Sequence, residues 1–292
     1  MSPHAALPPQ MYEGFESPGG LDELEQVSED PYVRQITLSS YRRILIVRQE
    51  AAPVNAAPDA PIFMLEEVQF QFPAPLVSFV ISSGMLCMGL SSNMLVLIEL
   101  NHEDKVIKIQ IPRKPSEMAL YKLFMDPSGR HIIITSQQGE NWYLYKTWKK
   151  PRQLKGFKMV IESVAWNKAA LLSSSHLTST REILIGARNG TIYEAVLDAE
   201  DDFFKSQERY LQSVFALPER HPITGIKFEY TPAADPKRAL VLATTPTRIY
   251  QFSGPVNRKP DENGRVFSNL FAQYRDAAPS TLDSPTRVRV HN

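Results

Sequence analysis

Apolar and polar positions along this chain follow one outline that occurs four times between residues 86 and 251. In each copy, two or three apolar residues lead into a small residue, a turn residue follows four positions later, and a second apolar run begins. The small residues are spaced by 46, 51 and 57 positions: Gly89, Thr135, Gly186 and Ala243. Two apolar runs joined by so short a polar segment indicate a β-hairpin. The sequence therefore predicts one repeated supersecondary unit, rather than a catalytic motif, as its organising feature.

Each hairpin is preceded by one further apolar segment, at residues 78–81, 121–124, 161–166 and 223–228. The segments are short, rich in β-branched and aromatic residues, and separated by turn signals such as Asp-Pro-Ser-Gly at 126–129, which suits a type I turn. A unit of about 40–50 residues with about four strands is typical of a propeller blade rather than of a sandwich strand pair. We therefore expect an all-β fold, a partial WD-like β-propeller with about four recognisable blades.

The ends of the chain do not follow this outline. Residues 1–30 carry seven carboxylates and no lysine or arginine, mixed with proline and glycine, which predicts a disordered acidic arm. Residues 31–275 form the predicted propeller portion, interrupted by an alanine- and proline-rich loop at 51–61. Residues 276–292 do not continue the blade pattern, and we expect an irregular tail.

Composition narrows the protein class. Of 292 residues 43% are hydrophobic, enough for a core, and 32 basic residues balance 32 acidic ones, which argues against a global basic field for nucleic acid. The single cysteine, Cys87, excludes an intrachain disulfide framework and suits a reducing compartment. No apolar run approaches the ~20 residues of a membrane span, and the N-terminus lacks a secretory pattern. We expect a soluble, intracellular protein.

Catalytic and metal-binding motifs are not found in the sequence. No two of the six histidines are spaced i, i+4, none lies near a second cysteine, and no Gly-x-Ser-x-Gly, Walker or Gly-x-Gly-x-x-Gly run occurs. A glycosidase-type carboxylate pair could converge from distant positions, but nothing selects two members. We expect no catalytic residue, no cofactor, no metal and no small-molecule substrate. We expect His131, Trp142, Trp166 and Cys87 to serve packing or turn formation.

The densest basic segment is interrupted by Trp148 and Phe157 and follows an aromatic strand, so we expect it at the exposed outer edge of one blade. It is a candidate for contact with acidic lipid headgroups or an acidic partner. The alternative interpretation is that these cations only protect an edge strand from pairing with another chain. The residues are Lys146, Lys149, Lys150, Arg152, Lys155 and Lys158.

Several segments together resemble the N-terminal propeller of the deep-orange (vacuolar protein sorting eighteen) family. The most specific are Glu-Ser-Val-Ala-Trp-Asn-Lys at 162–168 and Gly-Ala-Arg-Asn-Gly-Thr-Ile-Tyr-Glu at 186–194; residues 123–134, 244–252 and 267–274 continue the likeness, which covers about residues 32–274. The resemblance implies a non-enzymatic subunit of the class C core of the HOPS and CORVET complexes, which tether endosomal and vacuolar membranes before fusion. It implies other tethering subunits as partners and a cytoplasmic location, peripheral on the late endosome or vacuole (lysosome).

The family plan that this resemblance implies is a seven-bladed propeller followed by an α-solenoid and a cysteine-rich RING-like domain. This chain stops after about four recognisable blades, and we expect a truncated gene model, an alternative transcript or a fragment. Because an open arc of blades exposes faces that a closed propeller covers, we expect the isolated chain to be poorly stable or to self-associate. The alternatives are a propeller scaffold of another coat or pore complex and a propeller hydrolase.

Overall fold

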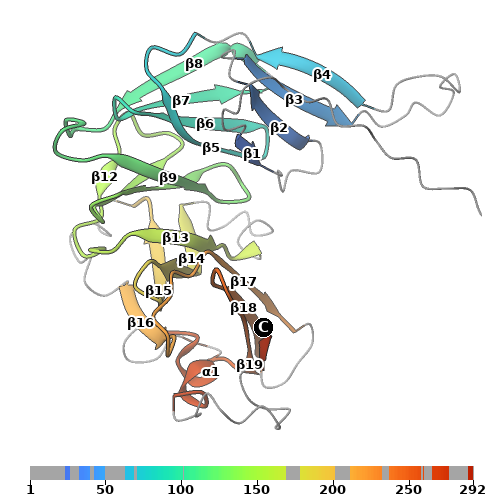
Figure 1. Cartoon of the computed structure of the whole chain (residues 1–292), viewed down its shortest axis with the longest axis vertical. Helices are drawn as coiled ribbons and strands as arrows, with labels where there is room; N and C mark the ends of the chain where they lie inside the picture. Colours follow the sequence, from blue (N-terminus) through green and yellow to red (C-terminus); the bar gives the residue numbers. More distant parts are fainter. Residues whose placement is uncertain are drawn as a thin grey trace, which may run out of the picture.

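The structure is a computed structural model of the chain (Figure 1). It describes backbone and side chains for residues 71–100, 105–168, 178–200, 211–231, 237–257, 259 and 265–275. For residues 24–26, 33–39, 43–49, 63–68, 102–104 and 289–291 it describes the backbone alone.

The strands form five four-stranded antiparallel sheets, each a meander in chain order. The first sheet is β1 (Leu24–Gln26), β2 (Val33–Ser39), β3 (Arg43–Gln49) and β4 (Phe63–Val68). The second is β5 (Leu76–Ser82), β6 (Met85–Leu90), β7 (Met94–Glu99) and β8 (His102–Gln110). The third is β9 (Leu120–Met125), β10 (His131–Ser136), β11 (Asn141–Tyr145) and β12 (Arg152–Gln153). The fourth is β13 (Ile161–Ala165), β14 (Ser179–Ala187), β15 (Thr191–Asp198) and β16 (Leu211–Ala216). The fifth is β17 (Gly225–Tyr230), β18 (Arg238–Thr244), β19 (Ile249–Pro255) and β20 (Arg289–His291).

The sheets succeed one another along an open arc, from the blue and cyan sheets at the top of Figure 1 to the orange sheet at the bottom. The first strands of successive sheets contact each other: β5 contacts β9, β9 contacts β13, and β13 contacts β17. Meandering sheets whose first strands gather on one side are blades of a propeller. The predicted all-β partial propeller is confirmed.

The details differ from the sequence prediction at both ends. One further sheet, β1–β4, precedes the four units that carry the small-residue outline; all of it except β1 lies within the predicted propeller portion, residues 31–275. Within the predicted acidic arm, Leu24–Gln26 pairs with β2, while the rest of residues 1–30 lies outside the described residues. Within the tail predicted to be irregular, Arg289–His291 forms β20 against β19.

Neighbouring sheets are joined by hydrogen bonds between a hydroxyl group of one sheet and the backbone of the next sheet's first strand or of the segment just before it. These bonds run from Leu123 N–H to Ser78 Oγ (3.1 Å), from Ile161 N–H to Thr135 Oγ1 (3.2 Å) and from Ser163 Oγ–H to the Ile223 carbonyl (2.6 Å). Each of these bonds ties one blade to the next.

The repeated small residues make room for these junctions. A Cβ atom on Gly89 would lie 3.0 Å from the Leu120 side chain, and one on Gly186 would lie 2.6 Å from Ile223 Cγ2. Leu120 and Ile223 are the apolar residues that lead into β9 and β17. A larger residue at either glycine would therefore push the next blade away.

In the fifth sheet the small-residue position is Thr244, not the predicted Ala243. In the fourth sheet Gly186 pairs with Ser163, and in the fifth sheet the equivalent pair is Thr244 with Gly225. Gly225 follows Ile223, which leads into its strand, by two residues. In the third sheet Lys122 follows Leu120 in the same way. The β18–β19 turn is one residue shorter, because Thr244 pairs with Ile249 whereas Gly186 pairs with Ile192. The outline places the small residue four positions before the turn residue. Because this turn is shorter, the outline assigned Ala243 instead of Thr244.

Local turn chemistry is as predicted at 126–129. Gly129 donates its N–H to the Asp126 carbonyl (2.9 Å) and has a φ of 70°, a conformation that favours glycine. The Asp126 carboxylate accepts the N–H groups of Arg130 and His131, both at 2.8 Å. His131 is buried and its Nδ1 lies 2.6 Å from the Tyr143 hydroxyl, so it has the predicted packing and turn-bonding role.

A short helix, α1 (Ser268–Ala272), covers β19 and β16 beside the fifth sheet. Its preceding backbone is held by the buried Glu194 of β15, whose carboxylate accepts N–H groups from Val266 (2.6 Å) and Phe267 (3.0 Å). Phe271 of the helix packs against Phe252 of β19. The helix therefore closes the core that the fourth and fifth sheets share.

Candidate functional site

The basic segment lies where the sequence predicted it, at the outer edge of one blade. It runs from the end of β11 through β12, the outermost strand of the third sheet, and on toward β13. Arg152 is half-buried, and the other five side chains are exposed: Lys146, Lys149, Lys150, Lys155 and Lys158. The edge strand itself is only two residues long.

The apolar residues of this segment attach it to the core. Phe157 is buried, and Trp148 packs against both the Tyr143 and Tyr145 rings in edge-on contacts. The Asn141 amide donates to the carbonyls of Phe157 (2.7 Å) and Met159 (2.8 Å). The backbone of the loop is thus held in place while its five lysine side chains are exposed.

Two of the cations have contacts that define their position. The Arg152 guanidinium lies over the Trp148 ring, 4.3 Å from its centroid, in a cation–π contact. The Lys146 ammonium lies 3.9 Å from the Glu99 carboxylate, and both side chains are well exposed, so this ion pair contributes little to stability. The surface is chemically suited to bind anionic groups.

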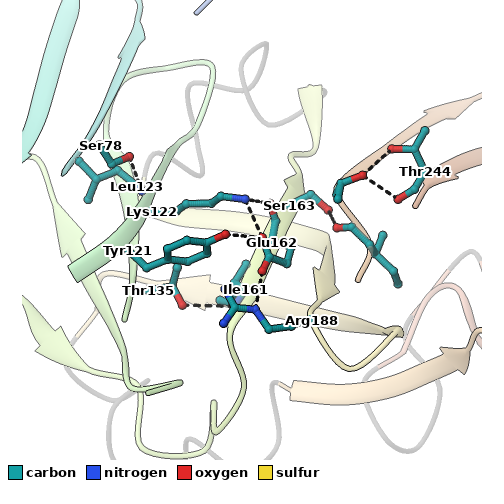
Figure 2. A network of polar contacts seen from close by, with 12 residues as sticks. Ser78, Tyr121, Lys122, Leu123, Thr135, Ile161, Glu162, Ser163, Arg188 and Thr244 are labelled. Atoms are coloured by element: carbon teal, nitrogen blue, oxygen red, sulfur yellow. Dashed lines mark hydrogen bonds and ion pairs between the residues drawn. The ribbon is translucent and has the colours of Figure 1, made fainter. Parts of the chain in front are cut away.

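A second polar site, which the sequence analysis missed, is centred on Glu162 and is shown in Figure 2. Its side chain is only 5% exposed, and Lys122 Nζ (2.6 Å), Arg188 Nε (2.7 Å) and the Tyr121 hydroxyl (3.1 Å) all contact the carboxylate. The Lys122 and Arg188 cations also lie over the Tyr121 ring, at 4.9 and 4.7 Å. The four residues, here called the Glu162 cluster, join the third sheet to the fourth.

Two β-bulges bring these side chains together. Ile161 and Ser163 pair with consecutive residues of β14, so Glu162 is the extra residue of the bulge. Tyr121 is likewise the extra residue between Leu120 and Lys122 on β9. A bulge re-aims a side chain out of the sheet alternation, which here directs both groups toward the neighbouring blade.

The electrostatics of the Glu162 cluster favour an ionised carboxylate. Burial by itself would raise the pKa of Glu162, but hydrogen bonds from Lys122, Arg188 and Tyr121 outweigh it and hold the pKa below its usual value. The Glu162 interaction in turn raises the pKa of Arg188. Both carboxylate oxygens of Glu162 are paired within the cluster, Oε1 with Arg188 and Oε2 with Lys122 and Tyr121, so the cluster acts as a clamp between blades. A glutamate inside an apolar strand was the only signal in the sequence, and its partners are 26 or more positions away.

The cysteine and the two tryptophans that were expected to serve packing are packed in the structure. Cys87 is fully buried, and burial raises the pKa of its thiol to about 12, which leaves it unreactive. Trp142 is buried and Trp166 packs against the core of the third and fourth sheets. Among the described residues, no group of three or more histidine, cysteine or acidic side chains could hold a metal ion. No helix within the described ranges is long and apolar enough to cross a membrane.

Comparison with known proteins gives one consistent result. The model of the Pep3/Vps18/deep orange beta-propeller domain matches residues 61–291. The chain is 30% identical over 269 residues to a vacuolar protein sorting-associated protein 18 homolog of Danio rerio, covering 91% of this chain and 27% of the relative. It is 29% identical over 180 residues to vacuolar sorting protein 18 of Arabidopsis thaliana, covering 60% of this chain and 16% of the relative. It is 29% identical over 186 residues to vacuolar membrane protein pep3 of Schizosaccharomyces pombe, covering 61% and 20%. The chain thus spans 27% or less of the length of these relatives.

Proposed function

The chain belongs to the Pep3/Vps18/deep orange β-propeller family, and from this premise we propose that it is a non-enzymatic interaction module of a membrane-tethering subunit. The complex is the class C core of HOPS and CORVET, which docks endosomal and vacuolar membranes before fusion during vacuolar protein transport. The chain acts in the cytoplasm, peripherally on the late endosome or vacuole, and its partners are the other tethering subunits.

The observation that carries this proposal is the family match over residues 61–291, which includes every strand from β4 to β20. The geometry is consistent with a binding role. The buried Glu162 carboxylate is paired within its cluster, whereas the exposed lysines of the basic segment lie on an outer strand and its turns. Such a molecule works through its surface.

Within that surface, the basic segment Lys146–Lys158 is proposed to contact the acidic headgroups of the membrane that the complex tethers. Its five lysines are exposed on a backbone anchored by Phe157 and Asn141, and each basic side chain near an anionic membrane contributes about 1 kcal/mol. The competing explanation, protection of the β12 edge, requires the cations only for solubility.

The test of complex membership is capture of the tagged chain, expressed at native level in cells, followed by identification of class C subunits. We expect these subunits with the wild-type chain. A variant with Ile134→Asp, which places a charge in the fully buried β10, should lose them because the blade no longer forms. Absence of every tethering subunit from the wild-type capture would contradict the proposal.

The test of the basic segment is flotation with vesicles containing about one third anionic lipid. Reversing Lys146, Lys149 and Lys150 to glutamate should weaken binding by at least about 100-fold, since three contacts of about 1 kcal/mol each are lost. The matched control reverses the exposed Lys114, Lys259 and Arg275, with the same change in net charge. Equal binding by both triple variants would mean that the segment only protects the edge strand. It would not contradict membership of the complex.

A further inference from the structure

The linker between the second and third sheets carries a serine in an exposed turn. Residues 112–117 are all exposed, whereas Ile111 before them and Met118 after them are fully buried. The linker is therefore an exposed loop between two buried anchors. Ser116 lies in this loop, and among the described residues its hydroxyl group has no hydrogen-bond partner. The hydroxyl is thus available for a reaction at the surface.

The turn around Ser116 is closed by few bonds. The N–H groups of Glu117 and Met118 both donate to the Lys114 carbonyl, each at 3.0 Å. Pro115 and Ser116 are the two central residues of the turn, and proline is favoured at the first of these positions. Because two exposed backbone bonds close the turn, a local opening can extend the segment without disturbing the adjacent strands. A protein kinase binds its substrate in such an extended form.

The charges that precede Ser116 match those that basophilic protein kinases bind. Arg113 and Lys114 lie three and two positions before the serine. Kinases of this class select substrates by setting their own carboxylates against cations at these positions. Among the described residues, Lys114 has no ionic partner, and the Arg113 side chain is 39% exposed. The exposed residues 112–117 thus include the serine and both cations that such a kinase contacts.

Arg113 connects this loop to the third sheet. Its guanidinium lies 3.2 Å from the Glu140 carboxylate in the β10–β11 turn and 3.9 Å from the Glu117 carboxylate. Both ion pairs are exposed, so each is weak. A phosphate group carries a charge of about −1.5 to −2 and attracts a guanidinium more strongly than a single carboxylate does. Since Arg113 already reaches Glu117, the residue after Ser116, a phosphate on Ser116 lies within its range.

We propose that Ser116 is phosphorylated by a basophilic serine/threonine protein kinase, and that the phosphate draws Arg113 away from Glu140. In the transfer, Ser116 Oγ attacks the γ-phosphorus of the ATP that the kinase holds with Mg²⁺. The bond from this phosphorus to the oxygen bridging to the β-phosphate breaks, ADP leaves, and a kinase carboxylate accepts the hydroxyl proton. Two cations and one carboxylate give residues 112–117 a net charge of +1, which the phosphate changes to about −1. The inference does not depend on the proposed tethering function.

The first test is peptide mass spectrometry of the tagged 292-residue chain, expressed at native level and isolated from cells in the presence of phosphatase inhibitors. We expect a phosphate that the fragment masses assign to Ser116. The variant Arg113→Gln should carry much less phosphate at this serine, because the kinase no longer recognises the segment. A wild-type chain without phosphate on Ser116 would overturn the proposal.

Recognition is measured with the purified chain, ATP with Mg²⁺, and the catalytic subunit of the cyclic-AMP-dependent protein kinase as the basophilic kinase. Arg113→Gln should lower kcat/KM for Ser116 at least about tenfold, because a charge-assisted contact with the kinase is lost. The matched control is Arg275→Gln, which removes an exposed cation outside the linker and should leave the rate unchanged. Thermal melting should be the same in all variants. Equal rates for Arg113→Gln and the wild type, or an equal loss in the control, would overturn the proposal.

The change of partner is measured by nuclear magnetic resonance of the Arg113 Nε–H group. Without phosphate, Glu140→Gln should shift this resonance, because the Nε–H group donates to the Glu140 carboxylate. With phosphate on Ser116, the same substitution should shift the resonance at most about one third as far, because the phosphate holds the guanidinium. Equal shifts in the two states would overturn the proposed change of partner.

Discussion

The third and fifth sheets of this propeller carry similar apolar strands in different surroundings. All six residues of β10 are buried, because Ile132 and Ile134 pack toward the second sheet while Ile133 packs toward the fourth. In β18 every second residue is buried, and the others face outward on the open side. Among the described residues, the third sheet has a neighbouring sheet on each face, whereas the fifth has a neighbouring sheet on one face.

This comparison shows that the inter-blade contacts carry much of the stability of each blade. Burial of apolar surface contributes about 25 cal/mol per Å² removed from water, so a leucine covered on both sides contributes more than one covered by its own sheet alone. Equivalent residues of successive blades therefore provide matched pairs for measurement.

The largest expected difference is between Leu184→Ala and Leu242→Ala. Leu184 is 0% exposed, and its truncation leaves a cavity that should lower the free energy of unfolding by about 3 kcal/mol. Leu242 is 40% exposed, and the same change should cost about 1 kcal/mol or less. Urea denaturation at a concentration where the chain is monomeric measures both. Equal losses would mean that the equivalent positions do not differ in packing.

The small-residue position should show the next largest effect. A methyl group on Gly186 would lie 2.5 Å from Ser163 Oγ as well as close to Ile223, so Gly186→Ala should destabilise the chain by about 2 kcal/mol. Thr244 already carries a larger side chain at the equivalent position on the open face, and Thr244→Ala should change stability by about 0.5 kcal/mol or less. Thermal melting of the two variants measures both changes in stability. A Gly186→Ala variant as stable as the wild type would contradict the close contacts at this junction.

Removing the charge at the centre of the Glu162 cluster should have a smaller effect. Glu162→Gln keeps the shape but loses the charge-assisted bonds to Lys122 and Arg188, which should cost about 1–2 kcal/mol. The exposed pair of Lys168 and Glu229, 2.8 Å apart, is the control, and Lys168→Gln should cost about 0.5 kcal/mol or less. Denaturation at neutral pH measures the loss of stability in both variants. Comparable losses would mean that burial does not strengthen the ion pairs of Glu162.

The smallest expected effect is the dependence of stability on pH. The pKa of Glu162 is lower in the folded chain than in the unfolded one, so the stabilisation is complete above the unfolded pKa of about 4.5 and is lost as the pH falls through the folded pKa. The stability difference between the wild type and Glu162→Gln should therefore shrink below about pH 4.5. Denaturation at pH 3.5 and pH 7 tests this, and a difference independent of pH would exclude an ionised carboxylate in the cluster.

Much of the fold could be predicted because it depends on local patterns. The alternation of apolar residues, the small residues such as Gly89 and Gly186, and the turn at Asp126 specify strands and hairpins within one blade. The burial of Cys87 followed from its apolar strand, and the packing or turn role of His131 from its place after Gly129-Arg130 at a strand start. The outer-edge position of the basic segment followed from the order of strands in the repeat.

Other features could not be predicted from the sequence because they depend on contacts between distant residues. The bulges that turn Glu162 and Tyr121 toward each other require the register of two different sheets. The one-residue shift to Thr244 depends on a shorter turn whose length the outline did not reveal. The first sheet carries no copy of the hairpin outline, so the outline alone did not specify its four strands.

The sequence by itself determined the repeated hairpin, the type of its turns and the resemblance to a propeller family, since these depend on residues close together in the chain. Only the tertiary structure decided which carboxylate is clamped between blades and which apolar face stays open. Leu184 and Leu242 belong to equivalent apolar strands, yet one is covered and the other is not, because burial depends on whether another sheet packs against that face.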